Sequence, residues 1–212
     1  MKVKRFYAYL CGVKSSVFSV LFLLLTAGCS SGLRSGDLIF VAGSGAEAGS
    51  MDEAIASATG TFTHVAIAEV KGDSAWVIDA TPRRGVDRHP LDTFRADFPG
   101  ARFAVARIKG VRADAALQRA KALCGRAYDL RFLPSNEEMY CSELVQACYL
   151  DAAGKPLFES EPMNWLAPDG TLPAYWERLF EELGMEVPQG VPGTNPQQLS
   201  ESPLLTFIRL DL

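Results

Sequence analysis

Two strand-like runs separated by a tight turn constrain the fold of this chain more than any other feature. Residues 63–70 and 75–80 are largely apolar, and residues 71–74 between them are Lys-Gly-Asp-Ser. A Gly-Asp pair between two such runs is typical of a two-residue hairpin turn. The pattern therefore predicts an antiparallel hairpin in which residues 71 and 74 pair.

This pairing determines which side chains share a face of the sheet. Continued along both strands, it places Asp79 opposite Ala66 and His64 opposite Thr81. His64 and Asp79 are then diagonal neighbours on one face, where their side chains can meet. A slip of one residue would move Asp79 to the other face, so the predicted contact depends on the turn.

The other segments predict an α+β domain with an antiparallel sheet packed against a helical layer. Residues 188–203, with four prolines and two glycines, are expected to form an ordered loop. Because strands follow one another and helices cluster, the order does not fit an alternating parallel architecture. Further strands are expected at residues 37–41, 102–108 and 204–210, and helices at residues 52–58, 113–124, 141–152 and 173–183.

The first 28 residues have the composition of a secretory signal. A basic start precedes an apolar run at residues 17–25, which is shorter than the roughly 20 residues that span a bilayer. The following Thr-Ala-Gly-Cys resembles a bacterial lipobox, in which the cysteine is lipidated, although the usual leucine is Thr26 here. The alternative is plain secretion with cleavage near Ala27. We expect a lipoprotein signal peptide at residues 1–28, a short tether at residues 29–35 from lipidated Cys29, and one domain at residues 36–212.

The charge of the mature chain excludes some partners. Removing residues 1–28 takes away four of the 21 basic residues and none of the 25 acidic ones, which leaves a net charge of −8. Nucleic acid is therefore not an expected partner, since its phosphates require lysine and arginine. The chain contains only two histidines and no Cys-x-x-Cys pair, so neither a structural metal site nor another cofactor is expected.

Cys141 is the candidate nucleophile. It heads the apolar face of the helix predicted at residues 141–152 and lies in its first turn, where the helix dipole favours a thiolate. By position alone, a small buried core residue is an equal alternative. Cys124 and Cys148 are expected in the core.

A thiolate nucleophile needs a base, and His64 is the candidate. It begins a predicted strand, where a side chain can overhang a cleft, whereas His89 lies before a proline in a charged segment and is expected at the surface. Asp79, as the diagonal neighbour of His64, can accept its ring N–H and fix the tautomer. Glu69 is expected to point to the opposite face, and Asp73 lies in the turn.

Five segments together carry a family resemblance. They are residues 36–40 (Gly-Asp-Leu-Ile-Phe), 63–67 (Thr-His-Val-Ala-Ile), 77–80 (Val-Ile-Asp-Ala), 128–132 (Tyr-Asp-Leu-Arg-Phe) and, as the most specific, 140–145 (Tyr-Cys-Ser-Glu-Leu-Val). With these segments the chain is similar to the NlpC-type cysteine hydrolases, specifically the circularly permuted YiiX/YebB-like branch with its papain-like fold. The similarity extends to residues 192–196 and 202–203 near the C-terminus.

The resemblance implies roles for individual residues. Cys141 would be the nucleophile, His64 the general base and then acid, and Asp79 the residue that orients His64, in a position where relatives often carry glutamate. Tyr128 corresponds to a family tyrosine that helps to bind the substrate carbonyl; a packed structural tyrosine is the alternative.

These roles predict a cell-envelope cysteine hydrolase that cleaves an amide through a thioester, with cell-wall peptide as the leading substrate class. Two alternatives remain: an amidase, esterase or acyltransferase acting on lipids or N-acyl amides, and a non-catalytic lipoprotein on the same scaffold. Ser30 follows Cys29, where aspartate would signal retention in the inner membrane, so we expect an anchor in the outer membrane facing the periplasm.

The anchor can be tested by metabolic labelling. The wild-type chain is expected to incorporate labelled fatty acid and to partition with membranes, because Cys29 supplies the sulfur for lipidation. The Cys29→Ala variant should be unlabelled, and gel fluorography of both proteins measures the difference. Label that persists in the variant would refute the assignment.

Overall fold

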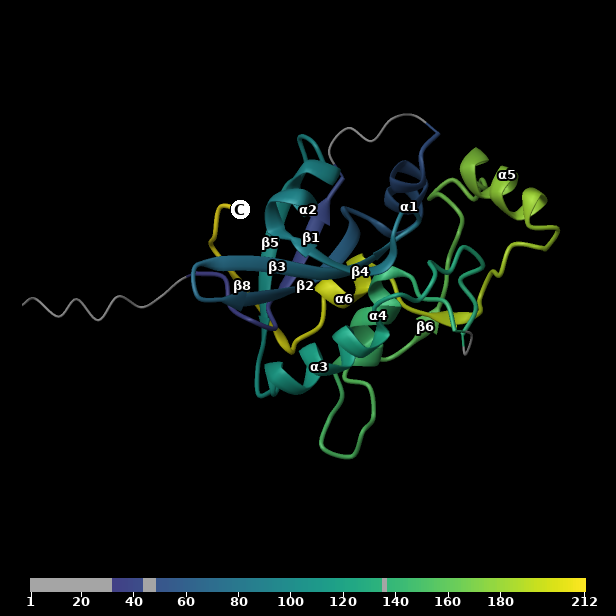
Figure 1. The fold of residues 1–212 in the computed structure, drawn as a ribbon. Coiled ribbons are helices and arrows are strands. Elements are labelled where there is room, and N and C mark those ends of the chain that lie inside the picture. Colours follow the sequence, from purple (N-terminus) through teal and green to yellow (C-terminus); the bar gives the residue numbers. More distant parts are fainter. Residues whose placement is uncertain (1–31, 44–48, 135–136) are drawn as a thin grey trace, which may run out of the picture. The chain divides into compact units, whose positions relative to one another are not determined.

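A six-stranded antiparallel sheet lies at the centre of the structure, a computed structural model that describes residues 32–43, 49–134 and 137–212 (Figure 1). The predicted signal segment 1–28 and Cys29 lie outside the described residues. The strand order is β4-β3-β2-β1-β5-β8. The strands are β1 (Leu38–Ala42), β2 (Phe62–Lys71), β3 (Ser74–Thr81), β4 (Gly85–Pro90), β5 (Arg102–Ile108) and β8 (Leu205–Ile208), and a separate pair joins β6 (Glu161–Pro162) to β7 (Pro192–Gly193).

The predicted hairpin register is confirmed. Strands β2 and β3 pair Lys71 with Ser74 and continue in step to Ile67 and Ile78. The two-residue turn between them contains Gly72 at a φ of 56°, in the left-handed region that a primed hairpin turn requires and that glycine enters without strain.

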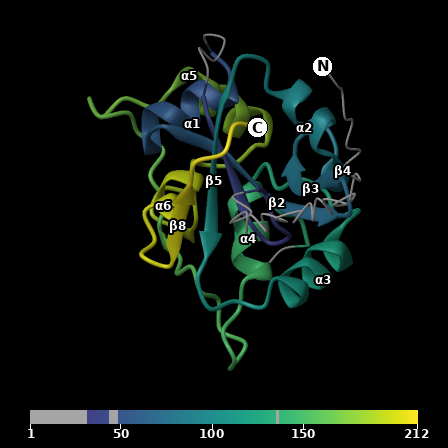
Figure 2. The same ribbon diagram turned by 90° about the vertical axis from the view of Figure 1, so that its left-hand side faces the viewer.

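Helices cover both faces of the sheet, and two of them pack on the face that carries Leu38, Phe40 and Val65. These are α3 (Ala113–Leu123) and α4 (Cys141–Cys148), whose buried side chains join that core cluster. The opposite face is covered by α2 (Leu91–Asp97), which buries Phe94 there (Figure 1). Helices α1 (Met51–Thr59) and α5 (Ala174–Glu182) pack together beside one end of the sheet (Figure 2), and α6 (Pro196–Ser200) contacts β2.

Five elements were not anticipated from the sequence: the short pair β6 and β7, and the three elements β4, α2 and α6. Strand β4 contains charged residues and forms by pairing with β3. Helix α2 follows it directly in the sequence. Helix α6 lies within the predicted loop 188–203 and carries a local signal for its start: Asn195 caps it in a capping box with Gln198, and Pro196 is its first residue.

One helix is shorter than predicted. Helix α4 begins at Cys141 as expected but ends at Cys148 instead of continuing to residue 152. Tyr149 leaves the helix in an extended conformation, and its buried hydroxyl donates to the carbonyl of Gly36 at 2.8 Å. This tertiary contact, which joins distant segments, outweighs the local helical tendency.

A β-bulge interrupts the pairing of β1 and β2 next to His64. Val41 pairs with His64, but the next residue, Ala42, pairs with Phe62, so Thr63 is an extra residue in β2. Bulges bend a strand and redirect its side chains. The bulge therefore sets the direction of the side chains at the beginning of β2.

No helix within the described ranges combines the length and the apolar run that crossing a membrane would need.

A network of charged side chains around the buried Glu69 ties the sheet to α3. Glu69 in β2 is only 2% exposed and accepts hydrogen bonds from Arg88 at 2.6 Å and from Lys121 of α3. It thus faces away from the His64 side, as expected. Burial alone would raise the pKa of Glu69, but these two cations lower it from an ordinary value of 4.5 to about 2.

This network predicts a measurable loss of stability in a Glu69→Gln variant. Because the folded-state pKa is depressed, the stabilisation is present above about pH 4.5 and disappears as the pH falls toward about 2. The variant should lose about 1–3 kcal/mol of unfolding free energy at neutral pH, measured by urea unfolding followed by circular dichroism. Its deficit should shrink in acid. Glu186→Gln, at an exposed position, is the control, and equal stability of the two variants would contradict the role of the network.

Candidate active site

Cys141 lies at the N-terminal end of α4, on the side that faces the sheet. Its side chain is buried, and Leu144 and Val145, on the same side of the helix, are completely buried in the core. Tyr140 is the residue that precedes the helix, and Glu143 lies in its first turn. Burial, followed by repulsion from Asp129, raises the pKa of Glu143 to about 7.

The structure brings His64 and Asp79 together. The Nε2 atom of His64 lies 2.8 Å from Oδ2 of Asp79, and the Asp79 side chain is completely buried. The hairpin register accounts for this contact, because the two residues are diagonal neighbours on β2 and β3. Since Nε2 is engaged with the carboxylate, Nδ1 is the ring nitrogen left for Cys141.

The surroundings of His64 favour its protonated form. Burial alone would lower its pKa, but charge attraction and hydrogen bonding from Cys141 and Asp79 raise it from 6.5 to about 10. Phe98 and Phe94 lie against the imidazole, with ring centroids 5.0 and 6.0 Å from that of His64. The ring thus packs against two aromatic side chains and is charged through neutral pH.

His89 is a correction to the sequence prediction. It lies in β4, is only 6% exposed, and is not a surface residue. Its Nε2 atom is 3.8 Å from Oδ1 of Asp79 and 3.4 Å from Nη2 of Arg84. Because β4 was not anticipated, nothing in the sequence placed this histidine behind Asp79.

Two cavities meet at Cys141 and His64. Cys141 lines a narrow one of about 40 Å³ with mostly apolar walls, and His64 lines a wider one of about 270 Å³. Tyr128 and Thr63 line both. The narrow cavity is bounded by Ile55, Phe132, Tyr140, Met163, Trp165 and Trp176; the wider one includes Asp52, Arg83, Arg84 and Asp97.

Tyr128, the predicted carbonyl-binding residue, therefore lies between the two cavities. Its hydroxyl lies 3.9 Å from the sulfur of Met51. Burial, followed by the nearby charge of Cys141, raises the pKa of Tyr128 above its ordinary range. The phenol consequently keeps its proton and can act as a hydrogen-bond donor.

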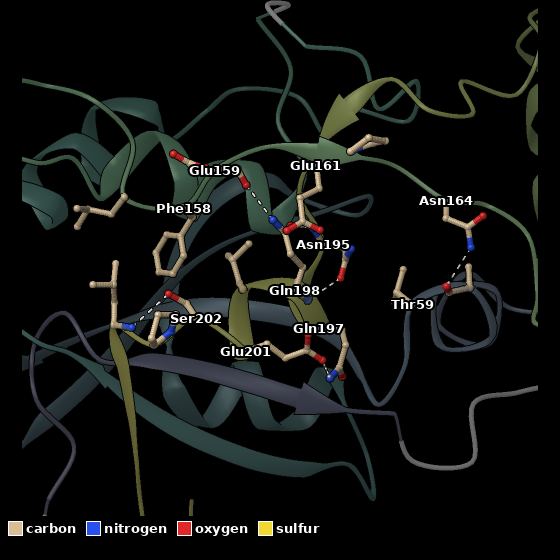
Figure 3. Close-up of a pocket in the computed structure, with 16 residues that line it drawn as sticks. Thr59, Phe158, Glu159, Glu161, Asn164, Asn195, Gln197, Gln198, Glu201 and Ser202 are labelled. Carbon is tan, nitrogen blue, oxygen red and sulfur yellow. Dashed lines mark hydrogen bonds between the residues drawn. The ribbon is translucent and has the colours of Figure 1, made fainter.

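A third and larger cavity, of about 650 Å³, adjoins the narrow one and shares Thr59, Asn164 and Asn195 with it. Figure 3 shows that carboxylates and side-chain amides line it. Glu159, Glu161 and Glu201 contribute the negative charge, and no lysine or arginine is among the described residues that line this cavity. The approach to Cys141 from this side is polar and acidic.

The remaining cysteines differ from Cys141. Cys124 is exposed at the end of α3, contrary to the expectation of a core position, and Cys148 is completely buried as predicted. The Cys124 sulfur is partly buried against the carbonyl of Ala120, and this partial burial raises the pKa of the thiol. Full burial raises the pKa of Cys148 to about 12. All three cysteines among the described residues are free thiols.

Comparisons with known proteins agree with this architecture. The model of the permuted papain-like amidases YaeF/YiiX, the C92 family, matches residues 32–209. The protein YiiX of Escherichia coli strain K12, described as uncharacterized, is 27% identical over 180 residues, which cover 82% of this chain and 85% of YiiX. A crystal structure described as metalloprotein YiiX from Escherichia coli O157:H7 superposes with a TM-score of 0.69 and 25% identity, and covers 84% of this chain and 97% of the other.

The description of that relative as a metalloprotein raises the question of a metal site here. Within residues 32–43, 49–134 and 137–212, no group of three or more histidine, cysteine, aspartate or glutamate side chains is arranged to hold a metal ion. The residues around Cys141 therefore do not fit a metal, and the chemistry of the site is derived from its side chains. By its matched sequence and its fold, the chain belongs to the permuted papain-like amidase family of YaeF and YiiX.

Proposed function

We propose that this protein hydrolyses an amide bond with Cys141 as nucleophile, His64 as proton carrier and Asp79 as the residue that orients His64. The observation that carries the proposal is the buried contact of 2.8 Å between His64 Nε2 and Asp79 Oδ2. In addition, the pKa of His64 is raised to about 10, in part by Cys141. A protonated imidazole beside a cysteine at a helix N-terminus is the arrangement that yields a thiolate–imidazolium pair.

In the acylation step, the Cys141 sulfur attacks the substrate carbonyl and the carbon–oxygen double bond opens to an oxyanion. The backbone N–H of Cys141, unused by the first turn of α4, and the hydroxyl of Tyr128 are the candidate donors to that oxygen. As the oxyanion collapses, the carbon–nitrogen bond breaks and His64 gives its proton to the leaving amine.

In the second half of the reaction, water attacks the thioester. His64 takes a proton from this water as the oxygen bonds to the carbonyl carbon, and the resulting oxyanion collapses with breakage of the carbon–sulfur bond. The carboxylic acid leaves, and Cys141 is again a thiolate beside the protonated His64. Asp79 keeps the ring in one orientation throughout and stabilises it whenever it is charged. The amine must depart on the His64 side, so the acyl part of the substrate occupies the Cys141 side.

We propose a peptide of the cell wall as the substrate class. The polar, acidic cavity of about 650 Å³ beyond Cys141 suits the amide and amine groups of a peptide. A second candidate, an N-acyl amide or lipid, is supported by the apolar walls of the narrow cavity at Cys141. We further propose that a lipid on Cys29 anchors the domain to the periplasmic face of the outer membrane. The domain would then act close to that membrane.

Thiol reactivity tests the proposed nucleophile. At about pH 6, iodoacetamide should alkylate Cys141 at least about tenfold faster than Cys124, because His64 is charged at this pH while burial raises the pKa of Cys124. Peptide mass mapping over time measures both rates in one sample. In the His64→Ala variant the preference should disappear, and a preference that survives would contradict the ion pair.

Turnover tests the proposed reaction and its substrate. The full-length protein is incubated in parallel with cell-wall muropeptides, phospholipid and N-acyl amides, and the products are identified by mass. We expect new amine and carboxyl ends in the muropeptides, and none with Cys141→Ala. Products from the lipids alone would favour the second candidate, and full activity in Cys141→Ala would exclude the mechanism.

Variants at position 79 test, in the same assay, whether the rate depends on the negative charge of this side chain or only on its place in the structure. Asp79→Asn should lower kcat by at least about tenfold, since an amide cannot stabilise the imidazolium. Asp79→Glu keeps the carboxylate that relatives often carry and should retain most of the rate. Asp73→Asn, an exposed turn carboxylate on the same hairpin, is the matched control. Equal rates for all three variants would remove Asp79 from the mechanism.

A further inference from the structure

Both histidines of the chain lie against the same buried carboxylate. The sequence contains two histidines in all. The Nε2 atom of His64 lies 2.8 Å from Oδ2 of Asp79, and the Nε2 atom of His89 lies 3.8 Å from Oδ1 of the same side chain. The proposed mechanism uses the first of these contacts and leaves the second histidine without a role.

The sheet brings the two histidines to Asp79 from the strands on either side. Strand β3 lies between β2 and β4. Asp79 pairs with Asp87, so His89, two residues further along β4, is a diagonal neighbour of Asp79 on the same face, as His64 is on β2. Phe94 of α2 covers both imidazoles, with ring centroids 6.0 Å from that of His64 and 6.3 Å from that of His89. The three polar side chains thus form one group beneath α2.

The second oxygen of Asp79 lacks a partner that would fix the carboxylate. Its Oδ1 atom accepts no hydrogen bond from the described residues. The last torsion of an aspartate side chain is broad, so a carboxylate held through one oxygen can turn. Such a turn would move Oδ2 away from His64. A donor at Oδ1 therefore decides how firmly Asp79 holds the catalytic ring.

Arg84 competes for the ring nitrogen that faces Asp79. Its Nη2 atom lies 3.4 Å from His89 Nε2. A guanidinium only donates, so Arg84 can use this nitrogen only when Nε2 carries no proton. In that arrangement a lone pair of His89 would face Oδ1 of Asp79. With a proton on Nε2, Asp79 gains a donor, and Arg84 keeps its hydrogen bond to Asp97.

The other ring nitrogen of His89 also faces a carboxylate, but one that water reaches. Oδ2 of Asp87 lies 3.6 Å from His89 Nδ1, and the Asp87 side chain is 42% exposed. Water can supply donors to Asp87, whereas the completely buried Asp79 depends on protein groups. The stronger demand for the proton therefore comes from the Asp79 side.

We propose that His89 is a positioning residue, whose Nε2–H faces Oδ1 of Asp79 and keeps the carboxylate in the orientation that binds His64. The inference rests on the roles proposed above for His64 and Asp79. At 3.8 Å the contact is longer than a hydrogen bond, and it acts as an attraction between the N–H and the carboxylate charge, which burial strengthens. His89 lines neither cavity at the catalytic pair, so it acts through Asp79 and not on the substrate.

Nitrogen NMR of the full-length protein with ¹⁵N-labelled histidine tests this role without a substrate. The parent chain carries Cys141→Ala, so that no thiol titrates together with His64. Its spectrum should show the His89 proton on Nε2. Because the chain has two histidines, the spectrum of every His89 variant reports His64 alone. His89→Phe should lower the proton affinity of His64 about tenfold, since Asp79 is no longer held. His89→Gln places an amide N–H near the lost Nε2–H and should lower it by less than about threefold.

A double-mutant cycle tests whether His89 acts through Asp79. In an Asp79→Asn background, His89→Phe should change the proton affinity of His64 by less than about twofold, because the carboxylate that it positions is gone. Asp92→Asn, at an almost fully exposed position in α2, is the matched control and should also change it by less than about twofold. If His89→Phe loses its cooperative unfolding transition, His89→Leu, with a smaller side chain, carries the same comparison.

The turnover assay adds a kinetic readout. His89→Phe should lower kcat for the muropeptides by about threefold to tenfold and leave KM unchanged, since His89 touches neither cavity. A change in KM alone would contradict a positioning role.

The remaining outcomes overturn the inference in different ways. An unchanged or raised proton affinity of His64 in His89→Phe overturns it, and a rise would mean that His89 draws the charge of Asp79 away from His64. Equal losses in His89→Phe and His89→Gln, or the same loss in the Asp79→Asn background, would assign the effect to packing. A His89 proton found on Nδ1 alone also overturns it. The NMR measurements involve no turnover, so failure of Cys141 to cleave amides would refute the proposed function and leave the NMR result unaffected.

Discussion

The hydrogen bond between His64 and Asp79 is the interaction on which the rest of the site depends. A completely buried carboxylate is costly unless a positive charge compensates it, and here the compensation comes from an imidazole 2.8 Å away. This bond fixes which ring nitrogen is turned toward Cys141, and it contributes to the raised pKa of His64. The aromatic side chains of Phe94 and Phe98 pack against the imidazole of this pair.

The sequence predicted this contact because it is governed by local geometry. A two-residue turn sets the register of β2 and β3, and the register decides that residues 64 and 79 share a face. The start of the helix at Cys141 was likewise predicted from the spacing of its apolar residues and the position of its first turn. Resemblance to the permuted papain-like hydrolases added the fold, which the family match supports, and the roles of the residues, which stay a prediction.

What the sequence did not predict are features created by contacts between distant segments. His89 was expected at the surface, but β4 pairs with β3 and buries it behind Asp79. The end of α4 was misplaced because a contact of Tyr149 with Gly36 stops the helix. The walls of the cavities likewise come from α1, α5 and residues 163–165 and 194–196, and no periodicity within one segment shows that these will meet. The bulge at Thr63 belongs to the same class, since it exists only in relation to β1.

The origin of the reacting groups in separate parts of the chain has a consequence for folding. The proposed base and its carboxylate lie on one hairpin, whose closure is local and fast for any chain. The proposed nucleophile lies on α4, and β4, α2, β5 and α3 lie between it and the hairpin in the sequence. Bringing the two together closes a long loop, which is the slow kind of step. The thiol of a partly folded or cleaved chain would therefore lack the His64–Asp79 pair, and the proposed reaction requires the whole domain.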